Sequence, residues 1–260
     1  MTFTPGSDGG RTDTYEAQVK GLSNQPTTEE EFKEAQSAGY KTKPVLLGPI
    51  TFLLLSKSTE GKNTLDLLDN LLPVYLEIVK KLNDLGAEWI QIDEPIFVKD
   101  LDEGVVSKIK KTLNSIKEAA GNSKILLTTY FESIDQKVKE EVFASDVDAV
   151  HLDLVRGENN FNYIKDSNKT LSLGVINGRN IWKSDLTQII DQIKDVKGDF
   201  IISSSCPLLH TPYDLDLETK VPENIKKWLA FAKQKLQEIN ILKQNINHGE
   251  AKSDLIDNKA

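Results

Sequence analysis

The sequence predicts an α/β protein of the (βα)8 TIM-barrel type, incomplete, with about six βα units. Short apolar runs alternate with longer amphipathic segments along residues 27–247. This alternation is typical of a parallel sheet with right-handed crossovers. The chain has 260 residues, 38% of them hydrophobic, which suits one barrel-sized domain with a substantial core. A closed barrel needs eight strands, but only six runs qualify, so we expect the barrel to be incomplete.

The predicted strands are short apolar runs bounded by polar or small residues. The most informative is Trp89–Ile92, because it ends abruptly in Asp93, Glu94 and Pro95. A strand covered by helices on both faces can be apolar throughout, and Pro95 stops it because proline lacks an N–H. The strands are expected at Pro44–Leu47, Trp89–Ile92, Ile125–Thr129, Ala149–Leu154, Leu171–Val175 and Phe200–Ser203.

The predicted helices have apolar residues at three- and four-residue spacing. The first predicted helix, residues 65–85, is followed by Gly86, which suits the position just after a helix. Pro73 is expected either to kink or to split this helix. The helices are expected at residues 65–85, 105–120, 186–196 and 225–242, the last with Trp228 and Phe231 on its apolar side.

Residues 1–26 are expected to form a disordered or adventitious leader, and residues 248–260 a polar tail.

The composition of the chain excludes several classes of function. A net charge of −8 argues against nucleic acid and anionic membranes, since both require a basic surface. We expect no membrane span and no secretory signal. The single cysteine, Cys206, excludes an internal disulfide and favours a cytoplasmic location.

Each predicted strand ends in polar or small residues, and the carboxyl ends of parallel barrel strands converge on one rim. We therefore expect a ligand-binding cleft there, in which the side chains position a substrate. Alternatively, some of these residues only bond loop backbone: Asn177-Gly178 suits a turn, and Ser203–Ser205 suits a helix cap. The candidate binding residues are Asp93, Glu94, His151, Asp153, Arg156, Asn177, Arg179 and His210.

The sequence offers few of the residues that a metal site or a phosphate-binding loop requires. Zinc that activates a thiol substrate takes His and Cys ligands, and one cysteine cannot build a two-thiolate site. A mixed set of His151, Asp153, Glu132 and Cys206 has no supporting spacing, so we predict no metal ligand and no bound cofactor. Residues 178–180 form neither a Walker nor a Rossmann pattern. No residue is assigned as nucleophile or general base.

Five segments point to a known family: residues 43–53 (KPVLLGPITFL), 72–75 (LPVY), 91–95 (QIDEP), 175–183 (VINGRNIWK) and 203–220 (SSSCPLLHTPYDLDLETK). Together they resemble cobalamin-independent methionine synthase, and more narrowly the later part of its N-terminal barrel. The resemblance is collinear and covers roughly residues 27–245.

The resemblance implies two face-to-face (βα)8 barrels that move a methyl group from 5-methyltetrahydrofolate polyglutamate to homocysteine. In that family the C-terminal barrel holds zinc through His, two Cys and Glu, and the N-terminal barrel is a scaffold that helps to hold the folate tail. Residues 151–153 stand where the catalytic barrel has His-x-Cys, Cys206 stands near the second zinc cysteine, and Asp93 resembles the acid that faces the folate ring.

On this basis we expect the chain to lack the C-terminal barrel and the first two strands of the N-terminal one. It would not be catalytic alone, and would act with a partner chain that supplies the zinc barrel. Two alternatives stay open. One is a stand-alone module for a small anionic or folate-like ligand, using Arg156, Arg179, Asn177 and His151; the other is an inactive relic fragment.

Overall fold

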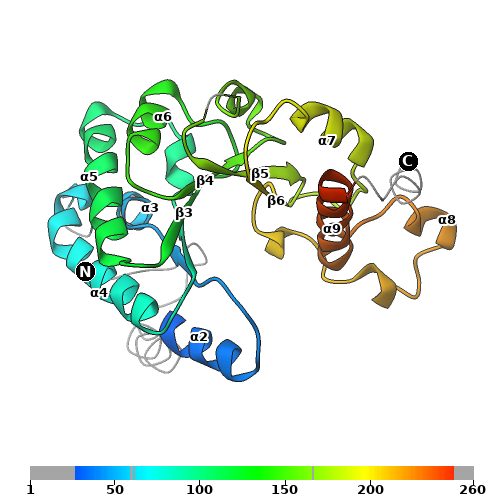
Figure 1. Ribbon diagram of the computed structural model, residues 1–260, viewed down its shortest axis with the longest axis horizontal. Coiled ribbons are helices and arrows are strands. Elements are labelled where there is room, and N and C mark those ends of the chain that lie inside the picture. Colours follow the sequence, from blue (N-terminus) through cyan, green and yellow to red (C-terminus); the bar gives the residue numbers. More distant parts are fainter. Residues whose placement is uncertain (1–26, 59–60, 62, 166, 249–260) are drawn as a thin grey trace. The chain divides into compact units, whose positions relative to one another are not determined.

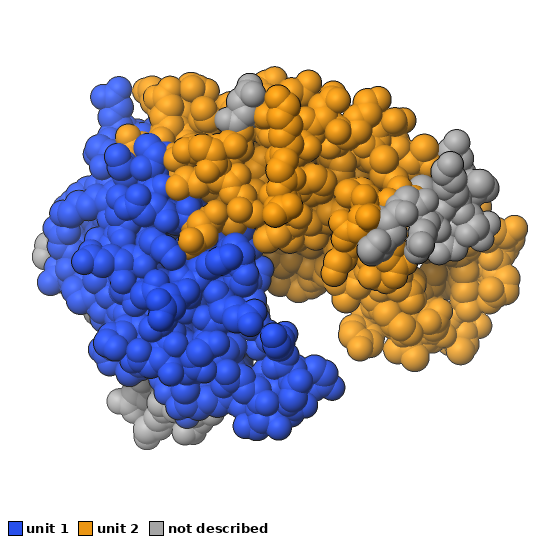
Figure 2. All heavy atoms as spheres, viewed as in Figure 1, with its two compact units in different colours: residues 1–96, 101–127, 144–147 blue, residues 97–100, 128–143, 148–260 orange. Residues whose placement is uncertain are grey.

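The computed structural model describes residues 27–58, 61, 63–165 and 167–248 (Figure 1). The predicted leader, residues 1–26, and nearly all of the predicted tail lie outside these residues. The chain divides into two compact units (Figure 2). Among the described residues, unit 1 comprises 27–58, 61, 63–96, 101–127 and 144–147, and unit 2 comprises 97–100, 128–143, 148–165 and 167–248.

Six strands of a parallel sheet follow one another in chain order, which confirms the predicted α/β class. All six predicted strands are present, with ends that differ by at most one residue. Most side chains of the interior strands are buried, as expected for strands that helices cover on both faces. The strands are β1 (Val45–Leu47), β2 (Trp89–Asp93), β3 (Lys124–Thr128), β4 (Ala149–Asp153), β5 (Thr170–Ile176) and β6 (Phe200–Ser204).

Two helices of unit 1, α2 (Thr28–Ser37) and α5 (Glu103–Ala119), begin at side chains that cap their first turn. At the start of α2, the Thr27 hydroxyl accepts from the Glu30 N–H, and the Glu30 carboxylate accepts from the Thr27 N–H, which forms a capping box. Asp102 caps α5 by accepting from the Val105 N–H at 3.0 Å. The helices are α2 (Thr28–Ser37), α3 (Pro49–Leu55), α4 (Leu68–Asp84) and α5 (Glu103–Ala119), with the 3₁₀ turns η1 (Thr64–Leu67) and, partly in unit 2, η2 (Pro95–Val98).

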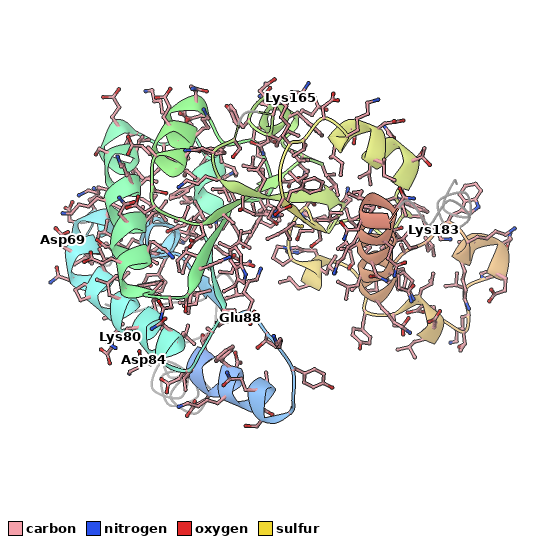
Figure 3. The ribbon with its side chains drawn as sticks, viewed as in Figure 1. Asp69, Lys80, Asp84, Glu88, Lys165 and Lys183 are labelled. Carbon is pink, nitrogen blue, oxygen red and sulfur yellow. The ribbon has the colours of Figure 1, made fainter. Side chains whose placement is uncertain are left out.

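Pro73 lies inside α4 without splitting it. The change from 3₁₀ to α geometry occurs earlier, between η1 and α4, and Pro73 is exposed within the continuous helix. As predicted, α4 is followed by a glycine, Gly86, with φ +82°. Lys80 and Asp84 form an exposed ion pair of 2.8 Å near the end of this helix (Figure 3).

The helices of unit 2 differ from the prediction near the C-terminus. The helix expected over residues 225–242 is confirmed only in its second part, residues 232–242, because Trp182 and Leu229 form an antiparallel bridge that interrupts it. The Lys183 N–H donates to the Trp228 carbonyl, so tertiary bonds replace helical ones. Trp228 is exposed, whereas Phe231 is buried with Leu229. The elements are α6 (Gln136–Phe143), η3 (Glu158–Asn162), α7 (Leu186–Ile193), η4 (Leu208–His210), η5 (Leu215–Leu217), α8 (Glu223–Lys226) and α9 (Ala232–His248).

A membrane-spanning helix is not found among the described residues, because none of their helices combines sufficient length with sufficient hydropathy.

Candidate functional site

Glu94, in unit 1, is a fully buried acid that completes the start of a helix. Its Oε1 accepts from the Ile50 N–H at 3.1 Å, and its Oε2 accepts from the Thr51 N–H at 2.6 Å. Both N–H groups belong to the first turn of α3, where no intrahelical acceptor exists. Burial raises the pKa of Glu94 to about 7, although the hydrogen bonds from Thr51 and Ile50 act in the opposite direction. The structure therefore uses this carboxyl to hold α3.

Gly48 makes this arrangement possible. A Cβ at this position would collide with the Glu94 carboxyl group. The Gly48 N–H also donates to the Asp93 carbonyl at 2.7 Å, which ties the end of β1 to the end of β2. The absence of a side chain at residue 48 lets the two strand ends approach closely.

Asp93, the other candidate in unit 1, is 6% exposed at the end of β2. Its Oδ1 accepts from Gln91 Nε2 at 2.6 Å. Its negative charge also reaches Lys43: burial lowers the pKa of this lysine, and the Asp93 carboxylate partly offsets the effect. Asp93 and Glu94 therefore differ in role, since only Glu94 is used to cap α3.

Asp153, in unit 2, binds the backbone of two loops. Its Oδ1 accepts from the Val155 and Arg156 N–H groups at 2.9 Å, and its Oδ2 accepts from the Phe131 N–H at 3.0 Å. Phe131 has φ +87°, a left-handed conformation that is costly for a residue with a side chain. Burial raises the pKa of Asp153, while these hydrogen bonds and the Arg156 charge lower it. Asp153 therefore stabilises a strained turn.

His151 is a buried residue whose ring nitrogens both have partners. Nε2 lies 3.3 Å from the Ser205 carbonyl oxygen, and Nδ1 lies 3.0 Å from Ser172 Oγ. A carbonyl only accepts, so we assign the proton to Nε2, and Nδ1 then accepts from the Ser172 hydroxyl. Gly174 leaves space for the ring, because a Cβ there would lie 2.8 Å from His151 Cε1.

The remaining candidates lie on loops that follow successive strands of unit 2. The Arg179 guanidinium carbon lies 5.0 Å from the centre of the Phe131 ring, and the His210 ring contacts the same ring edge-to-face at 5.6 Å. Arg156 and Arg179 are exposed, and within the described residues neither guanidinium donates a hydrogen bond or forms an ion pair. Asn177 Oδ1 accepts from the Arg179 N–H at 2.9 Å and so supports a turn.

We call Phe131, Arg156, Arg179 and His210 the arginine–aromatic cluster. Phe131 was not among the residues selected from the sequence. The only signal for it was an aromatic side chain directly after a strand end. The exposed guanidinium groups suit this cluster to bind an anion.

Zinc, which the family resemblance raises, does not fit these residues. Both ring nitrogens of His151 are engaged, and the Asp153 oxygens accept three backbone N–H groups. Cys206 is buried, and burial raises the pKa of its thiol, which disfavours the thiolate a metal requires. Among the residues that the structure describes, no group of three His, Cys, Asp or Glu could hold a metal ion.

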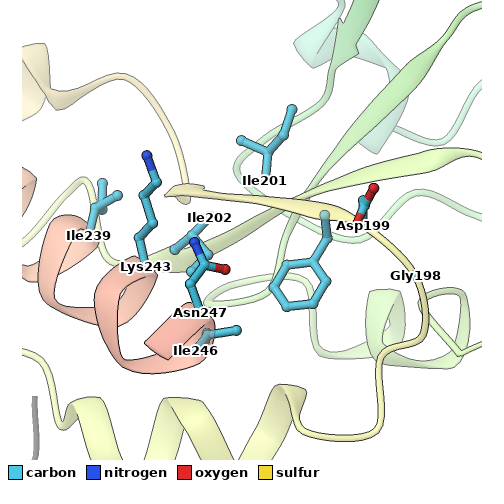
Figure 4. A pocket seen from close by; sticks show the side chains of 9 residues that line it. Gly198, Asp199, Ile201, Ile202, Ile239, Lys243, Ile246 and Asn247 are labelled. Carbon is cyan, nitrogen blue, oxygen red and sulfur yellow. The ribbon is translucent and has the colours of Figure 1, made fainter. Parts of the chain in front are cut away.

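A separate groove of about 570 Å³ in unit 2 lies between β6 and the C-terminal half of α9 (Figure 4). Its lining is mainly apolar and includes Phe200, Ile202, Ile239 and Ile246, with Lys243 among the polar residues. None of the eight candidate residues lines it.

A parallel α/β sheet whose six strands lie side by side in chain order has the strand order of the TIM-barrel class. Residues 14–200 match the family model described as the N-terminal domain of cobalamin-independent synthase. The chain belongs to this family, as the sequence resemblance indicated.

Two relatives are both named 5-methyltetrahydropteroyltriglutamate–homocysteine methyltransferase. The protein of Xylella fastidiosa (strain M23) is 40% identical over 237 residues, which cover 88% of this chain and 30% of the relative. That of Flavobacterium johnsoniae is 46% identical over 229 residues, which cover 82% of this chain and 29% of the relative. The chain therefore spans less than a third of the length of these relatives.

Two solved structures share the fold. A B12-independent methionine synthase from Shewanella sp. W3-18-1, in complex with selenomethionine, has a TM-score of 0.61 at 17% identity and covers 87% of this chain and 68% of that one. A methyltransferase from Methanosarcina mazei has a TM-score of 0.55 at 14% identity and covers 82% and 63%.

Proposed function

We propose that this chain is the part of a cobalamin-independent methionine synthase that binds the polyglutamate tail of a reduced folate and scaffolds a separate catalytic barrel. The relatives' name specifies a triglutamate-bearing methyl donor and homocysteine. A triglutamate tail is a flexible polyanion, so its binding site needs exposed cations with free donors. The arginine–aromatic cluster meets this requirement, and it is the observation that carries the proposal.

The geometry around Arg179 leaves its donors available. The Phe131 ring covers a face of the guanidinium at 5.0 Å, which favours the cation without using its N–H groups. The N–H groups along the edge of the planar group then remain free to bind a carboxylate through two parallel hydrogen bonds. Arg156 adds a second positive charge from the loop after β4, and it suits a second carboxylate of the tail.

Methyl transfer itself is assigned to a partner barrel. Attack by homocysteine requires an activated thiolate, and the family activates it with zinc. His151, Asp153 and Cys206 are committed to internal contacts in this chain. The contribution of this chain is therefore to orient the donor, with no residue acting as a nucleophile or general base.

Calorimetric titration of the purified chain tests the proposal, with γ-linked triglutamate and monoglutamate forms of 5-methyltetrahydrofolate as ligands. We expect the triglutamate to bind more tightly, with an affinity that falls as salt rises. Arg179→Gln and Arg156→Gln should each weaken triglutamate binding about tenfold, the value of one charge-assisted contact. Lys165→Gln is the matched control, because Lys165 is exposed in unit 2 and outside the cluster (Figure 3).

Equal affinity for the two ligands, or an Arg179→Gln variant that binds like the wild type, would contradict the proposal. The stand-alone binding module is distinguished by adding the catalytic barrel of a relative. A module of that kind binds its ligand with unchanged affinity, whereas a scaffold binds the triglutamate more tightly when the barrel is present.

A further inference from the structure

Two charged residues of α9, Lys235 and Glu238, are buried in unit 2, with exposed fractions of 0% and 3%. A charge that leaves water is costly unless it gains hydrogen bonds or a counter-charge. Burial lowers the pKa of Lys235 and raises that of Glu238, and each charge opposes the shift of the other. Both side chains find their hydrogen-bond partners in a single loop, residues 180–184.

Lys235 binds the acceptors of this loop. Its Nζ donates to Asn180 Oδ1 at 3.0 Å and to the Trp182 carbonyl at 3.1 Å. Asn180 Oδ1 also accepts from the Trp182 N–H at 3.3 Å, so the lysine reinforces a turn that the loop forms by itself.

Glu238 binds the donors of the same loop, one turn further along α9. Its Oε1 accepts from the Ser184 N–H at 3.0 Å, and its Oε2 accepts from the Ser184 hydroxyl at 2.8 Å. The cation therefore faces two acceptors and the anion faces two donors. A shift of the loop by one residue would break this match, so the pair specifies the register of the loop.

The far side of the loop is held by the short antiparallel pairing with residues 228–230. The Lys183 N–H donates to the Trp228 carbonyl at 2.9 Å, and the Ala230 N–H donates to the Ile181 carbonyl at 2.8 Å. Arg179 directly precedes residues 180–184, which are hydrogen-bonded to α9 on one side and to residues 228–230 on the other. Its position over Phe131 therefore depends on where the loop is fixed.

We propose that Lys235 and Glu238 are positioning residues that hold residues 177–184 in the conformation that places Arg179 over Phe131. Their effect on ligand affinity rests on the proposed function, whereas their effect on the loop does not. Neither residue touches the ligand. They act through Asn180, Trp182 and Ser184.

Hydrogen exchange and calorimetry on the full chain test this proposal together. In Lys235→Met, amide exchange at residues 178–184 and 228–230 should accelerate at least about tenfold, because two part-buried acceptors lose their donor. Exchange in β5 should stay at the wild-type rate, which separates a loop effect from general destabilisation. Affinity for 5-methyltetrahydrofolate triglutamate should fall about tenfold as the loop leaves its binding conformation.

Glu238→Gln keeps the test usable if Lys235→Met does not fold, since glutamine retains the shape and one acceptor for Ser184. Lys243→Met is the matched control, because Lys243 is an exposed lysine of the same helix outside the loop contacts. Loop exchange at the wild-type rate in the folded variants would overturn the proposal. So would faster loop exchange with unchanged triglutamate affinity.

If the wild-type chain does not bind triglutamate, the proposed function fails, and the loop exchange of the variants still decides the positioning role. Acceleration confined to residues 178–184 and 228–230 would support it, and acceleration throughout unit 2 would overturn it.

Discussion

Glu94 makes the stability of unit 1 depend on pH. Its pKa is about 7 in the folded chain against an ordinary value of 4.5, so the folded state binds a proton more tightly than the unfolded state. Below about pH 4.5 both states are protonated, and this group imposes no penalty. Between about pH 4.5 and 7 the carboxyl group ionises in the unfolded state but stays protonated in the folded state, so the free energy of unfolding falls as pH rises. Above about pH 7 the penalty is constant.

The shift from 4.5 to about 7 corresponds to a penalty of about 3 kcal/mol at neutral and higher pH. Glu94→Gln cannot ionise, so this variant should lose that pH dependence. It should also be less stable than the wild type at pH 5 by about 1–3 kcal/mol, because its amide presents an N–H to one of the α3 donors.

Urea unfolding followed by far-ultraviolet circular dichroism at pH 5, 6, 7 and 8 measures both effects. Glu88→Gln is the matched control, since Glu88 is an exposed acid next to the same strand (Figure 3). The free energy of unfolding of the control should follow the wild-type pH profile. Parallel profiles for wild type and Glu94→Gln would refute the reasoning.

Three further substitutions can be compared by urea unfolding at pH 7. Gly174→Ala should destabilise the chain by about 1–3 kcal/mol, because the new methyl group would lie 2.8 Å from the His151 ring; wild-type stability would contradict this packing. Asp153→Asn should cost about 1–3 kcal/mol, since one backbone N–H loses its acceptor; an unchanged midpoint would show that the loops do not need the carboxylate. Lys80→Ala removes the exposed ion pair with Asp84 and should change stability by less than about 0.5 kcal/mol; a larger loss would show that the pair matters more than exposed pairs generally do.

The six strands were predictable because buried parallel strands are short apolar runs with clear ends. The break in the helix expected over residues 225–242 was not predictable, because the amphipathic pattern there is helical throughout. Only the pairing of Leu229 with Trp182, far away in the sequence, shows that the chain is extended there. Tertiary hydrogen bonds override local preference at such positions.

The candidate site was predictable as a set of strand-end residues but not as a division of roles. Asp93 and Glu94 are adjacent acids, and only the contact with α3 shows that Glu94 is committed to a helix end. Lys235 and Glu238 escaped notice because charged residues spaced along a helix indicate a solvated face. Their burial depends on a loop that the sequence does not reveal as their neighbour.

The close approach of Gly48 to the Glu94 carboxyl group has a consequence for the evolution of the family. A relative with alanine at the position of Gly48, the first position, has no room for glutamate at the position of Glu94, the second. A relative with a shorter acid at the second position cannot reach the backbone N–H groups of α3. The two positions are therefore expected to change together or remain fixed together, so wherever an alignment of homologues shows one of them changed, the other should be changed as well. Glycine at the first position should occur wherever glutamate occupies the second.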